Sequence, residues 1–311
     1  MKLDTATRQD VLELIRLALR EDLGEDSEHA QLSGGVDCTT AALVPSDQVG
    51  TADLVSRDSG VIAGIEVARL LLEEVKCQIE FTATIEDGQL VNPQQTIGRL
   101  EGCAADILRL ERILLNFLGR LSGISSLTRQ YVDLINGTRA QIYDTRKTTP
   151  GWRRLEKYAV ACGGGANHRM GLYDAMMIKD NHLAFFRSQT GDSSNTILPA
   201  VAAARDWIER NQHGLPNGSK TILQLEVDTL DQFQIALQTD CDIVLLDNMS
   251  LDQLRRAVEM RDRQRPPLEL EASGGVNLQT VAAIAATGVE RISIGALTHS
   301  AINFDIGLDW R

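Results

Sequence analysis

The most constraining feature of this sequence is a repeating pattern in its last third. Four apolar segments rich in β-branched residues occupy positions 221–228, 241–248, 267–275 and 290–297, and they begin every 20 to 26 residues. Stretches with helical spacing lie between them, such as TLDQFQIALQ after the first segment and SLDQLRRAVEMRD after the second. Strands that alternate with helices in this way predict βα units and a parallel sheet.

Substrates of parallel α/β proteins bind at the carboxyl ends of the strands, in the loops that lead to the helices. The polar and glycine residues at these ends are therefore the first candidates for a site: Glu226, Asp228, Asp247, Asn248, Ser273, Gly274, Gly275 and Gly295. The backbone N–H groups of a glycine turn before a helix bind phosphate well, and a helix is expected to begin near Leu278. The alternative for residues 273–275 is a tight turn that needs glycine for a positive φ angle.

Glu226 and Asp247 end neighbouring strands and are expected to point into one opening. Two carboxylates there suit ribose hydroxyls, or a magnesium ion held through water. Capping of the following helix is the alternative, and it fits Asp228 better than either of these residues. A glycosidase-type acid–base pair is the weaker interpretation, because these segments offer few aromatic side chains on which a sugar can stack.

The first part of the chain predicts a mixed α and β unit. The expected elements are a helix at 7–21, a polar loop at 22–37, strand-like alternation at 50–64, a helix at 65–75, and two strands within 77–91 joined by a turn at Asp87-Gly88. A long helical pattern then covers residues 105–135. Gly119 and Gly123 interrupt this pattern and predict a division into two helices.

Composition argues against a membrane protein and indicates a cellular location. With 43% hydrophobic and 24% charged residues, it is an ordinary globular chain, and no apolar run reaches the roughly 18 residues of a membrane span. The amphipathic start lacks the apolar core of a signal peptide. A cytoplasmic location is therefore expected.

Several common kinds of site lack their motifs here. The five cysteines form no CxxC pair, which argues against a disulfide framework or a zinc site. The chain has no ATP P-loop, no dinucleotide-binding glycine fingerprint, no GxSxG nucleophile motif and no histidine pair with metal-ligand spacing. A net charge of −12 argues against nucleic-acid binding.

Positive charge is nevertheless concentrated in one stretch. Residues 144–182 hold seven Lys or Arg residues and four Asp or Glu residues. The basic residues stand among glycines and threonines rather than along a helical stripe, so a site for a small polyanion is favoured over a solvated charged face. Arginine grips carboxylates and phosphates with paired hydrogen bonds, whereas lysine acts as a point charge. His168, beside Arg169, is assigned to this site, while His182 and His299 fit structural hydrogen bonds.

Several strings of the sequence resemble the quinolinate phosphoribosyltransferase family, in that family's order along the chain. They include DTRKTTPGWR, GGGANHRMGLYDAMMIKDNH, DIVLLDNM, LEASGGVN and ISIGALTHSAINFDIGLD, and the likeness spans nearly the whole sequence. The resemblance implies an α/β fold, with an N-terminal α/β sandwich and an incomplete, open α/β barrel. The expected domains are residues 1–121, joined by the segment 298–311, and residues 122–297.

The same resemblance implies an enzyme of de novo NAD biosynthesis. The family transfers phosphoribosyl from phosphoribosyl pyrophosphate to quinolinate with decarboxylation, which yields nicotinate mononucleotide, pyrophosphate and CO₂. The implied cofactor is Mg²⁺, held mainly through substrate and water near Glu226 and Asp247 and without direct protein ligands. The implied partners are the two small substrates and a second copy of the chain, in a homodimer with shared active sites; no nucleic acid and no membrane are expected.

Residues that match the family's motifs receive roles by this resemblance. Lys147, Lys179, Glu226 and Asp247 are expected to be catalytic. The expected substrate-binding residues are Arg112 from the neighbouring subunit, Thr145, Arg146, Lys147, His168, Arg169, Lys179, Glu226, Asp247, Ser273, Gly274, Gly275, Ile294, Gly295 and Ala296. Among them, the basic residues suit quinolinate and pyrophosphate, the carboxylates suit ribose and magnesium, and the glycine loops suit the 5′-phosphate.

The chain departs from the family's pattern in two places, and two other functions stay open. The segment EDSEHAQLSGG is inserted before VDCTT, and the polar stretch 187–196 is longer than is typical; both are expected to be surface loops. One alternative is a related phosphoribosyltransferase that acts on nicotinate or another pyridine carboxylate. The other is a catalytically silent binding protein on the same fold. Arg112 and the His168-Arg169 pair, placed to grip a second carboxylate, favour quinolinate.

Overall fold

A computed structural model describes residues 2–24, 37–190 and 196–311. The chain divides into two compact units, which are described separately. The first consists of Met1–Arg129, Thr148–Gly165 and Leu297–Arg311, and the second of Gln130–Lys147 and Ala166–Ala296. Most of the loop expected at 22–37, and much of the polar stretch 187–196, lie outside the described residues.

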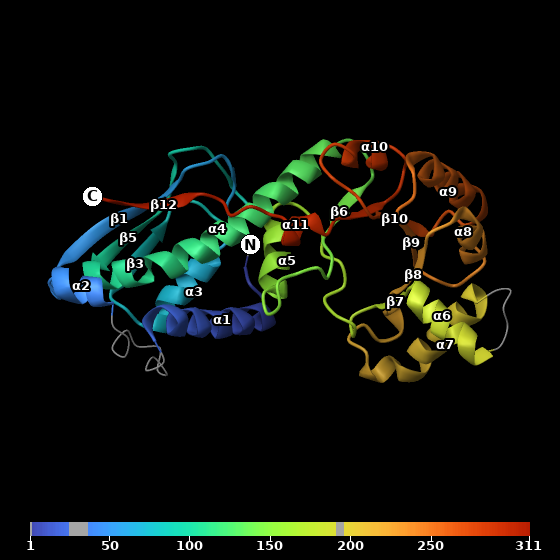
Figure 1. Cartoon of the computed structure of the whole chain (residues 1–311), viewed down its shortest axis with the longest axis horizontal. Coiled ribbons are helices and arrows are strands. Elements are labelled where there is room, and N and C mark those ends of the chain that lie inside the picture. Colours follow the sequence, from blue (N-terminus) through green and yellow to red (C-terminus); the bar gives the residue numbers. More distant parts are fainter. Residues whose placement is uncertain (1, 25–36, 191–195) are drawn as a thin grey trace. The chain divides into compact units, whose positions relative to one another are not determined.

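The first unit is built on a four-stranded antiparallel sheet with the order β12-β1-β5-β3. Its strands are β1 (Val49–Ser56), β3 (Ile79–Ala83), β5 (Thr96–Cys103) and β12 (Ile306–Trp310), and a short pair is formed by β2 (Gly60–Val61) and β4 (Leu90–Val91). Strand β12 comes from the end of the chain and pairs along β1, with Ala52 opposite Trp310 (Figure 1). The prediction of an α/β sandwich at the N-terminus is confirmed.

The helices of this unit include α1 (Thr5–Leu23), α2 (Cys38–Leu43), α3 (Ile65–Val75), α5 (Arg153–Cys162) and α11 (Ala296–His299). Helices α1 and α3 match the helices predicted at 7–21 and 65–75 closely. Asp4 caps the start of helix α1, because its carboxylate accepts the N–H of Thr7 at 2.6 Å. Asp87, predicted as a turn residue, also caps α3, because its carboxylate accepts the N–H groups of Ile65 and Glu66 at the start of that helix.

The predicted division of the long helix is wrong. Helix α4 (Ala104–Leu134) runs unbroken for 31 residues through both glycines. A Cβ atom at Gly123 would lie 2.0 Å from the carbonyl oxygen of Ile302, and one at Gly119 would lie 3.0 Å from that of Phe304. The glycines therefore let the C-terminal segment pass close to the helix, and this packing offsets the roughly 1 kcal/mol by which glycine disfavours a helix.

The second unit is a six-stranded sheet with the order β6-β11-β10-β9-β8-β7, and every neighbouring pair is parallel. Its strands are β6 (Gln141–Tyr143), β7 (Met176–Ile178), β8 (Leu223–Val227), β9 (Ile243–Asp247), β10 (Glu269–Ser273) and β11 (Arg291–Ser293). Strands β6 and β7 lie at the edges and do not pair with each other in the described residues. The predicted parallel, open sheet is confirmed.

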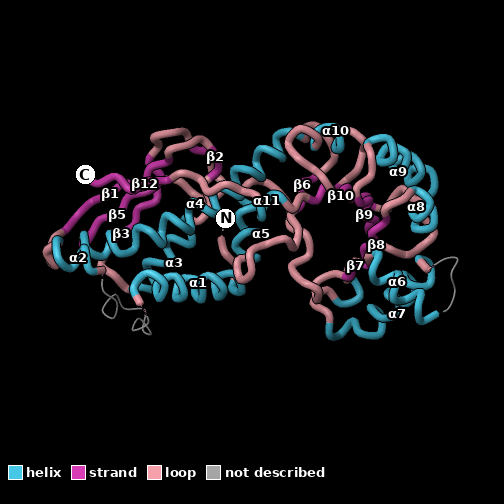
Figure 2. The backbone as a smooth tube through the Cα atoms, in the orientation of Figure 1, coloured by secondary structure: helices cyan, strands magenta, loops and turns pink. Residues whose placement is uncertain are grey.

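Helices cover one side of this curved sheet. They are α6 (Asp180–Thr190), α7 (Ile197–Asn211), α8 (Leu230–Ala236), α9 (Leu251–Gln264) and α10 (Val281–Ala285), with two short 3₁₀ turns at Gln212–Gly214 and Gly218–Lys220. Figure 2 shows α8, α9 and α10 on the outside of the strands. The predicted helix start near Leu278 is wrong, because α10 begins at Val281. Thr229 caps α8, so the capping alternative does not apply to Asp228.

The two faces of the parallel sheet carry different side chains. Side chains alternate between the faces along each strand, and residues in register on neighbouring parallel strands share a face. One face carries buried apolar residues, among them Leu225, Val244 and Ile292. The opposite face carries Gln224 and Glu271, both of which are also buried. The apolar face packs on the helices, so the polar face is available for chemistry. No helix in the described part of the chain is long and apolar enough to cross a membrane.

Candidate active site

The parallel sheet brings most of the predicted site residues to one edge. Lys179 directly follows β7, and since Ile178 pairs with Leu225, it stands beside Glu226 on β8. Asp247 pairs with Ser273 across β9 and β10. Three further groups also follow strand ends: Thr145, Arg146 and Lys147 after β6, Gly274 and Gly275 after β10, and Ile294, Gly295 and Ala296 after β11. The edge thus collects cations, carboxylates and glycine loops from all six strands.

Lys179 and Glu226 form an ion pair across neighbouring strands, with Nζ and Oε2 2.5 Å apart. The Glu226 side chain is 17% exposed and that of Lys179 is 43% exposed. The backbone of Lys179 is held as well, because its N–H donates to Nδ1 of His182 at 3.0 Å. His182 therefore has the structural role that was predicted for it, and the ammonium group of Lys179 is fixed next to a carboxylate.

The loop after β10 requires its glycines. Gly274 and Gly275 have φ angles of 93° and 61°, so the tight-turn interpretation of these residues fits the backbone. A Cβ atom on Gly274 would also lie 2.2 Å from Oδ1 of Asn248. Asn248, itself at a φ of 53°, donates from Nδ2 to Oδ2 of Asp247 at 2.7 Å and from its backbone N–H to the carbonyl of Ser273 at 2.8 Å. Asn248 therefore joins Asp247 to the glycine loop.

His168, a predicted substrate-binding residue, is held by several contacts, and its side chain is 9% exposed. The buried carboxylate of Asp144 accepts the side-chain amide of Asn167 at 2.7 Å and the N–H of His168 at 2.8 Å. Nδ1 of His168 accepts the N–H of Arg169 at 2.7 Å, and Nε2 lies 3.3 Å from Oε1 of Glu271. These contacts fix the backbone N–H groups of both His168 and Arg169.

Arg146 and Arg169 form the electropositive part of the site. Burial lowers the pKa of the Arg169 guanidinium, the nearby charge of Arg146 lowers it further, and Asp174 opposes both effects. Nη1 of Arg169 donates to the carbonyl of Ala175 at 2.9 Å. Nε of Arg146 is buried and has no acceptor among the described residues. Two neighbouring, partly buried guanidiniums, one of them with an unused donor, have the charge and hydrogen-bonding groups that suit an anion.

Glu271 is a buried charged residue beside the predicted site that was not among the predicted residues. It is fully buried, yet its pKa is low, at about 2: burial alone would raise the pKa, but His168 and Arg291 stabilise the charged form. Asp144 and Asn167, which hold the backbone at His168, were not predicted either, whereas Asn248 was among the candidates at the strand ends. The alternation of leucine and glutamate at 268–271 was the available signal, because period-two alternation predicts a strand with one polar face.

The other predicted residues are placed as follows. Lys147 is exposed, and its N–H donates to Oγ1 of Thr145 at 3.0 Å. Arg112 lies on α4 in the first unit, where its side chain is exposed. His299, which was left out of the predicted site, contacts Ser300, with Nδ1 and Oγ 2.7 Å apart.

The site offers little direct coordination for a metal ion. The described residues hold no group of three or more His, Cys, Asp or Glu side chains arranged as metal ligands. Lys179 neutralises the charge of Glu226. The carboxylate of Asp247 accepts a hydrogen bond from the neutral side-chain amide of Asn248. This donor set fits a hydrated magnesium ion that arrives with a phosphate ligand, because Mg²⁺ keeps several waters and few carboxylates in such sites.

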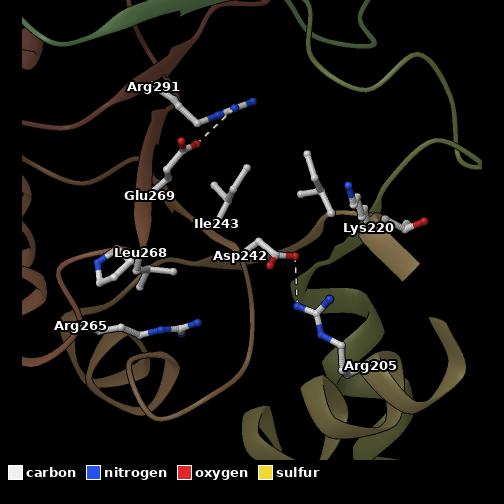
Figure 3. Close-up of a pocket in the computed structure, with 11 residues that line it drawn as sticks. Arg205, Lys220, Asp242, Ile243, Arg265, Leu268, Glu269 and Arg291 are labelled. Atoms are coloured by element: carbon white, nitrogen blue, oxygen red, sulfur yellow. Dashed lines mark hydrogen bonds and ion pairs between the residues drawn. The ribbon is translucent and has the colours of Figure 1, made fainter. Parts of the chain in front are cut away.

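A cavity lies at the opposite, amino-terminal ends of the strands. Its volume is about 640 Å³, and Ile243, Glu269 and Arg291, the first residues of β9, β10 and β11, contribute to its lining (Figure 3). Its arginines already have partners: Arg205 donates to Asp242 at 3.0 Å, and Arg265 donates to the carbonyl of Cys241 at 2.6 Å. Because these arginines already have partners, the cavity is less suited to an anion than the region of Arg146 and Arg169.

Comparison with known proteins agrees with the geometry. Residues 37–122 match the N-terminal domain of quinolinate phosphoribosyl transferase, and residues 124–309 match its C-terminal domain. A protein of Mycobacterium leprae named nicotinate-nucleotide pyrophosphorylase [carboxylating] is 41% identical over 283 residues, which are 90% of this chain and 93% of that protein.

Solved structures show the same likeness over the full chain. The nicotinate-nucleotide pyrophosphorylase of Francisella tularensis superposes with a TM-score of 0.83 at 32% identity, covering 100% of this chain and 98% of that one. The protein of the same name from Ehrlichia chaffeensis gives a TM-score of 0.82 at 35% identity, with both chains fully covered. The resemblance seen in the sequence is confirmed, and the chain belongs to the quinolinate phosphoribosyltransferase family.

Proposed function

We propose that this protein transfers the phosphoribosyl group of phosphoribosyl pyrophosphate to quinolinate and then removes one carboxylate, the carboxylating nicotinate-nucleotide pyrophosphorylase reaction of NAD biosynthesis. Family membership supports the activity. The structural observation that carries it is the pair of half-buried guanidiniums of Arg146, which follows β6, and Arg169, which lies close enough for the two charges to interact. Fixed cations let a dicarboxylate and a pyrophosphate ester bind side by side despite their mutual repulsion.

The chemistry needs no covalent nucleophile from the protein. The lone pair of the pyridine nitrogen forms the bond to C1 of the ribose as the C1–O bond breaks, and its electrons leave with pyrophosphate. Positive charge develops on the ribose during this step, and the carboxylates of Glu226 and Asp247 are proposed to stabilise it. The bond from C2 to its carboxylate then breaks to release CO₂. The pyridinium stabilises the electron pair left on C2, which takes a proton from water.

Lys147 and Lys179 are proposed to stabilise the charge of the departing pyrophosphate. The glycine loops at 273–275 and 294–296 are proposed to bind the 5′-phosphate through backbone N–H groups, and the positive φ angles of Gly274 and Gly275 support a close approach. Mg²⁺ is proposed to enter with phosphoribosyl pyrophosphate near Asp247 and Glu226, where it would neutralise phosphate charge.

We further propose that the enzyme is a cytoplasmic homodimer in which Arg112 completes the active site of the partner subunit. The exposed position of Arg112 on α4 is compatible with this role. Leu172 and Tyr173, in the loop that follows Arg169, are 73% and 53% exposed. Large exposed apolar side chains beside a site are typical of a surface that another subunit covers.

The deciding experiment combines purified protein with phosphoribosyl pyrophosphate, Mg²⁺ and quinolinate that carries ¹³C in its 2-carboxylate. Release of labelled CO₂ together with nicotinate mononucleotide is the expected result. A parallel reaction with nicotinate tests the alternative substrate: nicotinate forms the same mononucleotide without CO₂. Faster turnover of nicotinate than of quinolinate would overturn the substrate assignment. Absence of pyrophosphate release with either acid would indicate a silent binding protein.

A further inference from the structure

The carboxylate of Glu271 is fixed on three sides inside the parallel sheet. Its Oε2 accepts the side-chain amide of Gln224, from β8, at 3.0 Å and Nε of Arg291, from β11, at 2.9 Å. Its Oε1 faces Nε2 of His168 at 3.3 Å. The guanidinium of Arg291 is itself held over the ring of Tyr143, 3.7 Å from the ring centroid. Because Gln224 and Arg291 both hold Oε2, the carboxylate of Glu271 keeps one orientation, in which Oε1 faces His168.

The two ring contacts of His168 define its tautomer. Nδ1 accepts the backbone N–H of Arg169 at 2.7 Å, so Nδ1 carries a lone pair rather than a proton. The proton of a neutral imidazole is then on Nε2, which points at Glu271. The charged group that faces this ring is Glu271. Arg291 forms ion pairs with Glu271 at 2.9 Å and with Glu269 at 3.5 Å. Nδ1 of His168 thus accepts a hydrogen bond from the Arg169 backbone, while Nε2 lies within ion-pair distance of the buried carboxylate, whose Oε1 has no hydrogen-bond partner among the described residues.

We propose that Glu271 is a positioning residue for substrate binding: it holds His168 in the Nε2–H tautomer, and His168 in turn holds the backbone of Arg169 so that its guanidinium meets the anionic substrate. This inference rests on the proposed function. Because Glu271 is fully buried, it is proposed to act through His168. The contacts link the sheet interior to the most electropositive part of the site.

Glu271→Gln tests the proposal because the amide reverses one hydrogen bond. The Oε2 position receives two donors, from Gln224 and Arg291, so the oxygen of the new amide must occupy it. The amide nitrogen then faces His168, whose Nε2 must accept, and the imidazole proton moves to Nδ1. There it opposes the N–H of Arg169. We expect the tautomer of His168 to switch and the KM for quinolinate to rise roughly tenfold, the effect of one misplaced hydrogen bond, with a smaller change in kcat.

The tautomer is read by ¹⁵N NMR of the ligand-free protein. The chain has five histidines, and the signal of His168 is the one missing in His168→Gln. Glu269→Gln is the matched control, since Glu269 is on the same strand and 3.5 Å from Arg291 but has no contact with His168 in the described structure. We expect this control to keep both the tautomer and the KM. A melting curve of each variant reports any general loss of stability.

Three outcomes overturn the proposal: a wild-type protein whose His168 carries its proton on Nδ1, a Glu271→Gln variant that keeps the Nε2–H tautomer, or one that switches tautomer with an unchanged KM. If Glu271→Gln does not fold, the wild-type spectrum still decides the first point. If wild-type protein does not consume quinolinate, the proposed function fails, while the tautomer measured without ligand still tests the contact between Glu271 and His168.

Discussion

Two adjacent glycines in the loop after β10 should respond very differently to alanine. Gly275 has a φ of 61°, and no described atom lies within 4 Å of a Cβ added there. Gly275→Ala therefore carries only the backbone cost of the left-handed region, about 1 kcal/mol. Gly274 has a φ of 93°, and its Cβ would lie 2.2 Å from Oδ1 of Asn248. Gly274→Ala must both strain the backbone and displace Asn248.

The larger cost follows from the contacts that Asn248 makes. When its side chain moves, the 2.7 Å hydrogen bond from Nδ2 to Asp247 is lost. Backbone strain of about 2 kcal/mol and one lost hydrogen bond of about 1 kcal/mol lower the free energy of unfolding by about 3 kcal/mol in total. Urea denaturation of both variants, followed by circular dichroism, measures the difference. Because Asp247 loses its orienting partner, the KM for phosphoribosyl pyrophosphate should also rise in Gly274→Ala.

A double variant separates the two parts of this cost. Adding Asn248→Gly to Gly274→Ala removes the side chain that the new methyl group meets. The double variant should keep the backbone strain and the lost Asp247 contact, about 3 kcal/mol, and any greater loss in Gly274→Ala alone measures the steric part. Equal unfolding free energies for Gly274→Ala and Gly275→Ala would refute the packing of Asn248 against this loop.

Three further predictions concern the charged groups of the site. Lys147→Ala and Arg169→Ala should each lose turnover by orders of magnitude in a quinolinate-consumption assay while their circular dichroism spectra stay native, and wild-type rates would refute their roles. Arg112→Ala mixed with Lys147→Ala should recover activity that neither has alone, because a mixed dimer contains one intact shared site; no recovery contradicts the sharing. The pKa of Glu271 is depressed to about 2 from 4.5, so its contribution to stability is present above pH 4.5 and lost as the pH falls toward 2. Denaturation against pH should therefore show the stability difference between wild type and Glu271→Gln shrinking over that range.

The parallel sheet is where sequence reasoning was most successful. The apolar segments between 221 and 297 became β8, β9, β10 and β11 in register, and the residues at their carboxyl ends came together as expected. Strand periodicity and the position of a strand end are local properties, so a sequence displays them directly. The conserved handedness of βα units then leaves few ways to arrange them.

The long helix α4 shows where such reasoning fails. Gly119 and Gly123 weaken a helix locally, so the sequence predicts a break there. The backbone of Ile302 and Phe304 packs against these glycines, about 180 positions further along the chain. No local signal reports a contact over that separation.

By itself, the sequence determined which segments form strands and helices, where the glycine turns stand, and that lysines and arginines gather between residues 144 and 182. Only the tertiary structure decided which charges meet: Glu226 binds Lys179, 47 residues away, and the buried Glu271 holds His168 through its ring. Secondary structure follows from neighbours along the chain, whereas the pairing of a buried charge depends on strands that become adjacent only when the sheet has formed.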